Sequence, residues 1–91
     1  MVGYIYHIIN KINGKRYIGE TIQYEVRKKT HLRNLKNGEH HSTKLQNAWN
    51  KYGEDNFEFY VKQIEVSSLA ELNKIEQEEI KQYNSYYDGY N

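Results

Sequence analysis

Residues 4–20 have the sequence YIYHIINKINGKRYIGE, in which two β-prone segments flank a turn signal. Residues 4–9 and 16–20 are rich in aromatic and β-branched side chains, which favours strands. Asn13-Gly14 lies between them and is a strong signal for a tight turn. This segment therefore predicts an antiparallel hairpin.

The rest of the chain predicts three helices and one more strand. Helices are expected at residues 24–37, 42–52 and 69–83, a strand at residues 57–66, and a turn-like tail at residues 84–91. Gly38 and Gly53 are typical helix stops, Ser42 is a typical N-cap, and Ser68 with Glu71 forms a capping box. The order β-β-α-α-β-α predicts an α+β domain, with a small three-stranded antiparallel sheet flanked by helices.

Composition narrows the class of protein. A length of 91 residues suits one domain, residues 1–91, and a chain without cysteine has no disulfide frame, Fe–S cluster or thiolate zinc site. No long apolar run or signal-peptide pattern is present, so we expect a cytoplasmic protein with no membrane partner. Residues 1–53 hold ten Lys or Arg against three acids, whereas residues 54–91 hold three against nine. The basic half could form a positive face for phosphate, or the two halves could pair with each other.

Glu76 is the most unusual residue in this pattern, because it lies on the apolar stripe of the last predicted helix. Four side chains fall within about 40° of it on a helical wheel: Leu69, Leu72, Ile80 and Tyr83. Glu79 falls at the edge of the stripe and is the only other carboxylate expected near Glu76. A carboxylate facing a core costs several kcal/mol unless it is paired, protonated or bound to a cation. The alternatives are a metal site, a buried salt bridge or escape to solvent.

Tyrosines gather in the predicted hairpin. Tyr4 and Tyr6 share one face of the first strand, and Tyr17 and Gly19 share one face of the second. If the two faces coincide, several phenols lie beside a bare patch of backbone, where a ligand or another backbone could approach. An aromatic core cluster is the alternative interpretation.

The first predicted helix adds a cation and an imidazole on one face. His31 lies within about 40° of Arg27 on the wheel, and the planar fork of Arg is suited to gripping phosphate. His40 and His41 precede the second predicted helix, and a His pair alone is a weak signal for a metal site. Proton transfer, phosphate contact or no role are all open for them.

Tyrosines, one Arg and one core-facing Glu are the parts expected of a nuclease that uses one metal ion. A site with two metal ions fits poorly, because only one carboxylate is expected near Glu76. No GxSxG elbow and no phosphate-binding GxGxxG or GxxxxGK[ST] loop is present.

Together these residues resemble the GIY-YIG nuclease superfamily. Tyr4-Ile5-Tyr6 occupies the first motif and, after ten residues, Tyr17-Ile18-Gly19 forms the second. The resemblance continues in order through Arg27, His31, Gly38, His40, Ser42, Lys44-Leu45-Gln46, Glu76 and Asn91. It covers nearly the whole chain and is strongest to the catalytic domains of phage and intron-encoded homing endonucleases. In the first motif Tyr4 stands where the family usually has Gly, and Gly3 comes one place earlier.

The resemblance implies a DNA endonuclease that hydrolyses phosphodiester bonds with one divalent cation, Mg²⁺ or Mn²⁺. Tyr6 or Tyr17 would serve as the general base that activates water, or help to form it. Arg27 would hold the scissile phosphate, and Glu76 would bind the metal ion beside the leaving oxygen.

The resemblance also assigns supporting roles. His31 and His40 would assist proton movement and phosphate contacts, Gly19 would be structural, and Asn91 would brace the site. Relatives carry a separate DNA-binding region, so the chain could be part of a longer protein. We expect a monomer that binds double-stranded DNA weakly and with little sequence preference. A nucleic-acid-binding module without turnover is the competing hypothesis, but binding alone does not need the carboxylate.

Overall fold

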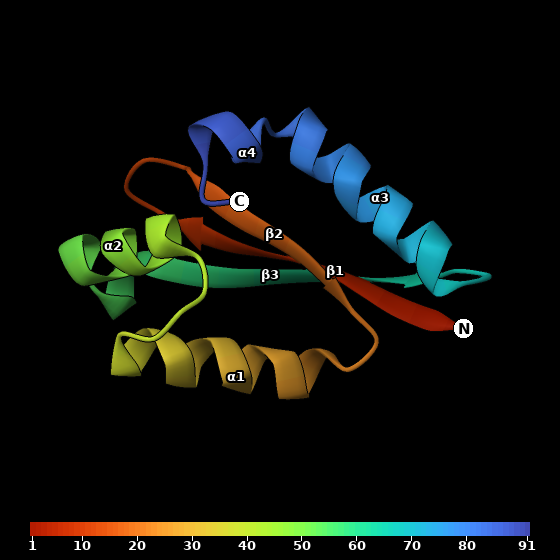
Figure 1. The fold of residues 1–91 in the computed structure, drawn as a ribbon, viewed down its shortest axis with the longest axis horizontal. Coiled ribbons are helices and arrows are strands. Elements are labelled where there is room, and N and C mark those ends of the chain that lie inside the picture. The colour runs from red at the N-terminus through yellow and green to blue at the C-terminus, as the bar shows by residue number, and fades with distance from the viewer.

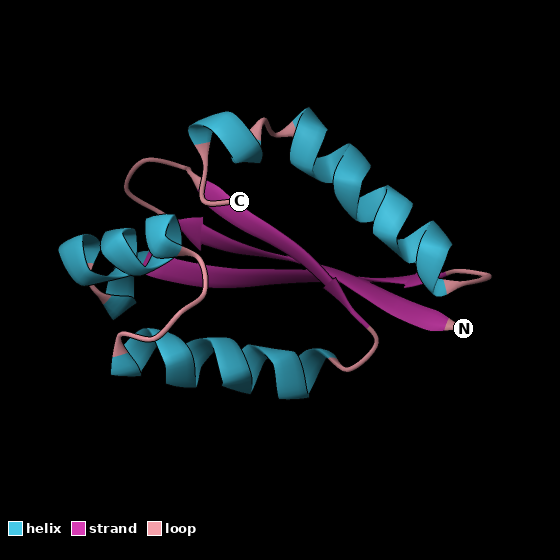
Figure 2. Cartoon of the chain, viewed as in Figure 1, coloured by secondary structure: helices cyan, strands magenta, loops and turns pink.

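Three antiparallel strands form the centre of the molecule, in the order β2-β1-β3, with helices on both sides (Figures 1 and 2). The computed structural model describes all 91 residues. The elements are β1 (Val2–Asn10), β2 (Arg16–Thr21), α1 (Tyr24–Asn37), α2 (Thr43–Tyr52), the 3-10 turn η1 (Glu54–Asn56), β3 (Phe57–Glu65), α3 (Leu69–Gln82) and α4 (Ser85–Asp88). The predicted α+β class and the order β-β-α-α-β-α are confirmed. No helix has the length and apolar character needed to cross a membrane.

The hairpin forms as predicted, with longer strands. Gly14 in the turn has a φ of 76°, a conformation that glycine adopts without the steric cost of a side chain. Residues of β1 then lie opposite residues of β2 in a register that places Tyr6 across from Gly19 and Ile8 across from Tyr17. The two phenol-bearing faces therefore coincide.

The helix ends follow the predicted caps. α1 stops at Gly38, which has a φ of 73°, and the side chain of Ser42 accepts a hydrogen bond from the Leu45 amide at the start of α2. The Ser68 side chain likewise accepts from the Glu71 amide at the start of α3. The 3-10 turn and α4 are additions, and α4 falls in the tail that was predicted to be turn-like.

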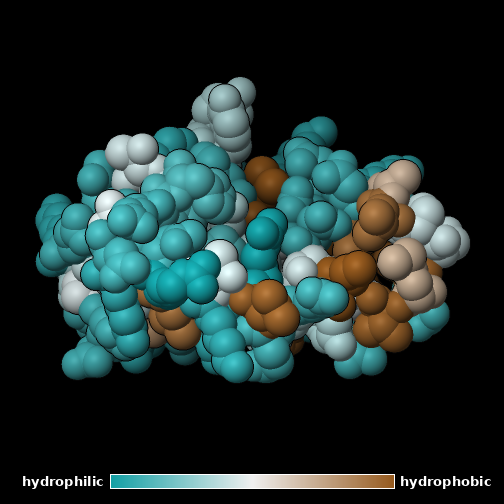
Figure 3. Space-filling model, turned by 60° about the horizontal axis from the view of Figure 1, so that its bottom comes forward, coloured by the Kyte–Doolittle hydropathy of each residue, from teal (hydrophilic) through white to brown (hydrophobic).

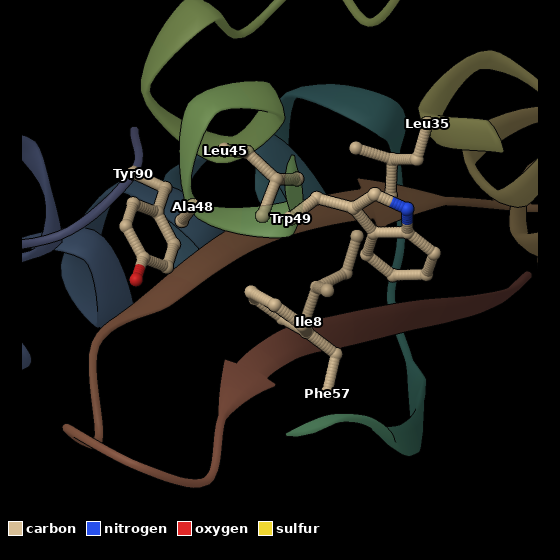
Figure 4. Packing of buried hydrophobic residues seen from close by; sticks show 7 residues of the cluster. All are labelled: Ile8, Leu35, Leu45, Ala48, Trp49, Phe57 and Tyr90. Atoms are coloured by element: carbon tan, nitrogen blue, oxygen red, sulfur yellow. The ribbon is translucent and has the colours of Figure 1, made fainter. Parts of the chain in front are cut away.

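Separate clusters of apolar side chains cover the two faces of the sheet. α1 and α2 pack against one face through a cluster of Ile8, Leu35, Leu45, Ala48, Trp49, Phe57 and Tyr90 (Figure 4). α3 packs against the other face through a cluster of Ile5, Ile18, Val66 and Leu72. Because β1 is central and alternates its side chains between the faces, it contributes Ile8 to one cluster and Ile5 to the other. This alternation sends Tyr6 and the neighbouring His7 to opposite sides of the sheet.

Candidate active site

Tyr6 and Tyr17 lie on the sheet face that α1 and α2 cover. Tyr6 is buried and Tyr17 is half-buried. A Cβ atom added to Gly19 would lie 2.3 Å from the Tyr6 hydroxyl oxygen, so a side chain at this position would collide with the phenol. The space beside Gly19 is therefore filled by the Tyr6 ring and not by a separate ligand.

Tyr4 lies at the edge of this aromatic group. The rings of Tyr4 and Tyr6 each have their centroids 6.1 Å from that of Tyr24, at the start of α1. The residue that replaces the usual glycine of the first motif therefore packs beside Tyr24. Gly3 faces the opposite side, where an added Cβ would lie 2.8 Å from the Leu72 side chain.

α1 brings Arg27 and His31 to the phenols. Burial raises the pKa of both Tyr6 and Tyr17, the positive charge of Arg27 lowers it, and the negative charge of Glu76 raises it again. Burial, the charge of Arg27 and the charge of Glu76 thus all act on the Tyr6 and Tyr17 hydroxyls. The structure thus brings together Tyr6, Tyr17, Arg27 and Glu76, which the sequence had placed on four separate elements.

A hydrogen-bonded chain runs from the backbone of Ser42, the N-cap of α2, to Tyr6. The Ser42 amide donates to His40 Nδ1 at 3.0 Å, His40 Nε2 lies 2.7 Å from His31 Nδ1, and His31 Nε2 lies 2.6 Å from the Tyr6 hydroxyl. Burial lowers the pKa of His31 to about 3 and of His40 to about 4, so both rings are neutral at neutral pH.

The Ser42 amide fixes the direction of this chain. A neutral imidazole carries one proton, and His40 accepts at Nδ1, so its proton is on Nε2. His40 then donates to His31 Nδ1, and His31 donates from Nε2 to the Tyr6 oxygen. The two buried histidines are therefore donors toward Tyr6 and do not accept its proton.

Tyr17 has a different partner. Its hydroxyl lies 2.9 Å from Nε2 of His41, an exposed residue of the turn between α1 and α2. The His41 ring stacks on that of His40 with a centroid distance of 4.4 Å. His41 therefore contacts Tyr17, whereas His40 is linked to Tyr6 through His31.

α3 buries other side chains than the helical wheel predicted, and that prediction was wrong. Glu79, expected at the edge of the stripe, is only 7% exposed, whereas Leu69 and Tyr83 are 57% and 45% exposed. Glu79 is buried because it is paired: its carboxylate lies 2.8 Å from His7 Nε2 and 2.6 Å from Lys62 Nζ. Glu76 is half-buried rather than central to the core.

Glu76 faces a second carboxylate that the sequence interpretation missed. Burial raises the pKa of Glu76, and the charge of Glu20, on β2, raises it further. The neighbouring Gln77 side chain donates a hydrogen bond to the Glu76 carboxylate at 3.1 Å, and this bond, the Glu20 backbone and the charge of Arg27 act in the opposite direction and lower the pKa. α3 contacts β2 more than any other strand, and β2 is an edge strand, so Glu76 reaches the site across this edge. Strand alternation from Gly19 would have placed Glu20 on the face that α3 covers.

Asn91 holds the outer edge of β2. Its side-chain oxygen accepts from the Ile18 amide at 2.7 Å, and its side-chain nitrogen donates to the Ile18 carbonyl at 2.7 Å. The Tyr90 amide donates to the Arg16 carbonyl at 3.0 Å. The chain end thus satisfies backbone groups that an edge strand leaves unpaired. It fixes the segment that carries Tyr17 and Gly19.

Comparison with known families decides the class of this domain. The model of the GIY-YIG catalytic domain matches residues 2–91. The chain belongs to the GIY-YIG catalytic domain family. Two solved GIY-YIG structures are similar, both of the catalytic domain of the intron endonuclease I-TevI, one of them a mutant. The first has a TM-score of 0.89 and 36% identity over 96% of this chain and 94% of that one. The mutant has a TM-score of 0.88 and 36% identity over 100% and 93%.

Curated relatives of this GIY-YIG domain are longer proteins. Intron-associated endonuclease 1 of Enterobacteria phage T4 is 40% identical over 94 residues, which cover 96% of this chain and 35% of that protein. Probable intron-encoded endonuclease 1 of Neurospora crassa is 32% identical over 87 residues, which cover 90% of this chain and 27% of that protein. The chain thus spans about a third of these relatives or less.

Proposed function

We propose that this GIY-YIG domain is a metal-dependent DNA endonuclease that hydrolyses phosphodiester bonds with one divalent ion and a tyrosine-assisted water. The proposal rests on one observation: at the edge of β2, the charges of Arg27 and Glu76 both act on the hydroxyls of Tyr6 and Tyr17. Phosphodiester hydrolysis needs a base, a cation at the phosphate and stabilisation of the leaving oxygen, and these four side chains match those needs. The relatives named as endonucleases support the same activity.

The carboxylates at this edge fit a hard divalent cation. Glu76 forms no salt bridge, although the charge of Arg27 acts on it, whereas Glu79 is paired with His7 and Lys62. No group of three or more His, Cys, Asp or Glu side chains is arranged to hold a metal. Mg²⁺ commonly binds through one or two carboxylates and keeps several waters, so Glu76, with Glu20 beside it, would hold such an ion. When bound, the ion would neutralise charge that develops on the phosphate and the leaving oxygen.

The remaining groups would orient and polarise the reactants. Arg27 is exposed and next to both phenols, so its guanidinium would grip two oxygens of the scissile phosphate. Tyr6 receives a hydrogen bond from His31, which would hold the phenol oxygen in place and stabilise negative charge on it. A free phenol has a pKa near 10, so a tyrosine base needs nearby cations or a proton acceptor.

Binding to double-stranded DNA would be weak and would depend on charge rather than base sequence. Most of the face that carries α1 is hydrophilic, with apolar side chains gathered at one end (Figure 3). Four basic side chains of α1 are exposed: Arg27, Lys29, Arg33 and Lys36. Phosphate contacts of this kind carry no sequence information and weaken as salt rises. We propose that the domain acts as a monomer and that any sequence preference resides elsewhere.

Nicking of supercoiled plasmid tests the proposed function. We expect conversion to open circles when Mg²⁺ or Mn²⁺ is present, with none after chelation by EDTA and recovery when excess Mg²⁺ is restored. Salt-dependent DNA binding without nicking in either metal would contradict the proposal. That result would assign the chain to the class of binding modules without turnover.

A further inference from the structure

We infer that His41 accepts the proton of Tyr17 during cleavage and releases it to solvent. This inference rests on the proposed function and gives the domain a proton path distinct from the buried His31–His40 chain. His41 acts through Tyr17, and we therefore describe it as a positioning and proton-accepting partner, not as a group that touches the phosphate.

The geometry distinguishes the two phenols. Tyr6 faces Nε2 of His31, which carries a proton because the Ser42 amide fixes the tautomers of His40 and His31. This nitrogen donates to the Tyr6 oxygen and cannot accept the Tyr6 proton. Tyr17 faces His41 Nε2 at 2.9 Å, and no backbone or side-chain donor fixes the tautomer of His41. A His41 ring with its proton on Nδ1 can therefore accept from the Tyr17 hydroxyl.

His41 also has a route to water. It is exposed and lines an open cavity of about 450 Å³ together with Tyr17, Ser42 and Lys44. The buried chain ends instead at a backbone amide, which cannot take up a proton. Of the two tyrosine–histidine pairs, only Tyr17–His41 connects a phenol to solvent through a ring free to accept.

The groups around His41 permit a transient positive charge. The neutral His40 ring stacks on it at 4.4 Å and the neutral His31 ring lies at 6.1 Å. Tyr17 faces it from β2. The ammonium of Lys44, which lines the same cavity, is directed to the carbonyl oxygens of Tyr86 and Asn91 at 2.7 and 3.0 Å.

The step balances without another reagent. The O–H bond of Tyr17 breaks and an N–H bond forms at His41 Nε2, which gives a phenolate and an imidazolium. The phenolate takes a proton from the attacking water as the water oxygen bonds to phosphorus and the bond to the leaving 3′-oxygen breaks. The 3′-oxygen takes up a proton from bulk water and leaves as a hydroxyl. The imidazolium then loses a proton to bulk water, and exchange with water returns the remaining ring proton to Nδ1, which restores the accepting form of His41. Burial raises the pKa of Tyr17, and such a phenol needs an acceptor of this kind.

The test is the plasmid-nicking rate of His41→Ala, with Glu39→Ala as the control because Glu39 is a nearby exposed side chain. General acid–base groups typically contribute about 10²–10⁴-fold. We expect His41→Ala to lose about 10²-fold in rate while Glu39→Ala keeps the wild-type rate. Because the site of His41 is open, added imidazole should restore part of the rate. Among substituted imidazoles of similar size, the restored rate should rise with basicity.

A second variant separates proton transfer from a structural effect. In the double variant Tyr17→Phe/His41→Ala the added imidazoles should restore nothing, because no phenol proton remains to be accepted. If the wild-type domain cleaves DNA and His41→Ala cleaves equally fast, this inference is overturned while the proposed function stands. The same holds if His41→Ala unfolds at the wild-type urea concentration but no imidazole restores its rate. Absence of cleavage by the wild-type domain would instead overturn the proposed function.

Discussion

Glu76 and Glu79 lie one turn apart on α3 and face different surroundings. Glu79 points to the middle of the sheet, where His7 and Lys62 hold its carboxylate. Hydrogen bonds from these partners outweigh the effect of burial, so the pKa of Glu79 is lowered, whereas burial and Glu20 raise the pKa of Glu76. Two glutamates on one helix thus differ in their electrostatic surroundings, because only Glu79 is held in salt bridges.

Replacing Arg27 by Lys tests whether the guanidinium grips phosphate. Lysine keeps the positive charge but loses the two parallel hydrogen bonds of the planar fork. We expect cleavage to lose about 2–4 kcal/mol of transition-state stabilisation, by analogy with removal of one oxyanion donor. The measurement is the initial rate of plasmid nicking at saturating Mg²⁺.

Arg33→Lys is the matched control, since Arg33 is exposed and lies about 120° from Arg27 around the axis of the same helix. Its rate should equal that of the wild type. Equal rates for Arg27→Lys and Arg33→Lys would mean that Arg27 is simply part of the basic surface.

β2 is the element on which the site depends, because side chains approach it from both faces of the sheet. α1 and the turn after it bring His31 and His41 to one face, α3 brings Glu76 across the edge, and Asn91 pairs with the backbone of Ile18 at that edge. An edge strand has no neighbour on one side, and so α3 can reach past it. The bare backbone at Gly19 lets the Tyr6 phenol extend under the same strand.

Local signals in the sequence predicted this hairpin, the limits of α1 and the N-caps, because turns and caps depend on neighbouring residues. The burial of α3 was predicted less well. A helical wheel gives the angle of Leu69 but not whether the sheet extends beneath that turn, and it cannot show that His7 and Lys62 will pair with Glu79. Contacts between elements, such as that of Glu20 with Glu76, also need the packed fold.

The site residues show the same division. Motif spacing selected Tyr6, Tyr17, Arg27, His31, His40, Glu76 and Asn91, and the structure brings all of them to the β2 edge or to the hydrogen-bonded chain behind it. Sequence could not show which phenol pairs with which imidazole. That choice depends on the fixed tautomer of His40 and on the turn that presents His41.

The whole molecule carries three buried histidines, and their protonation should control its stability in acid. Burial lowers the pKa of His7, His31 and His40. Their pKa values in the unfolded chain are near 6.5. As the pH falls below that value the unfolded state takes up protons that the folded state does not, so stability decreases. His31 and His40, whose folded pKa values lie below this range, should each cost about 1.4 kcal/mol between about pH 7.5 and pH 5.5, and His7 adds a loss of the same sign. Protonation of Glu76, whose folded pKa is raised, opposes part of this loss.

Urea unfolding at the two pH values measures the effect. His7→Gln should retain the fold, since His7 lies on the face opposite Tyr6, and its stability should depend less on pH because the lowered pKa of His7 no longer contributes. A free energy of unfolding that stays constant over this range in the wild type would mean that the histidines are protonated in the folded protein.

The central claim is that Glu76 serves chemistry rather than stability, and the most direct test is the single-turnover cleavage rate of Glu76→Gln in Mg²⁺. Glutamine has nearly the same shape, and removing a half-buried charge that forms no salt bridge should leave the free energy of unfolding unchanged or raise it. Glu78→Gln, an identical change at an exposed position of α3, is the control. We predict no detectable cleavage by Glu76→Gln and a wild-type rate for Glu78→Gln. Cleavage by Glu76→Gln at the wild-type rate would contradict the account.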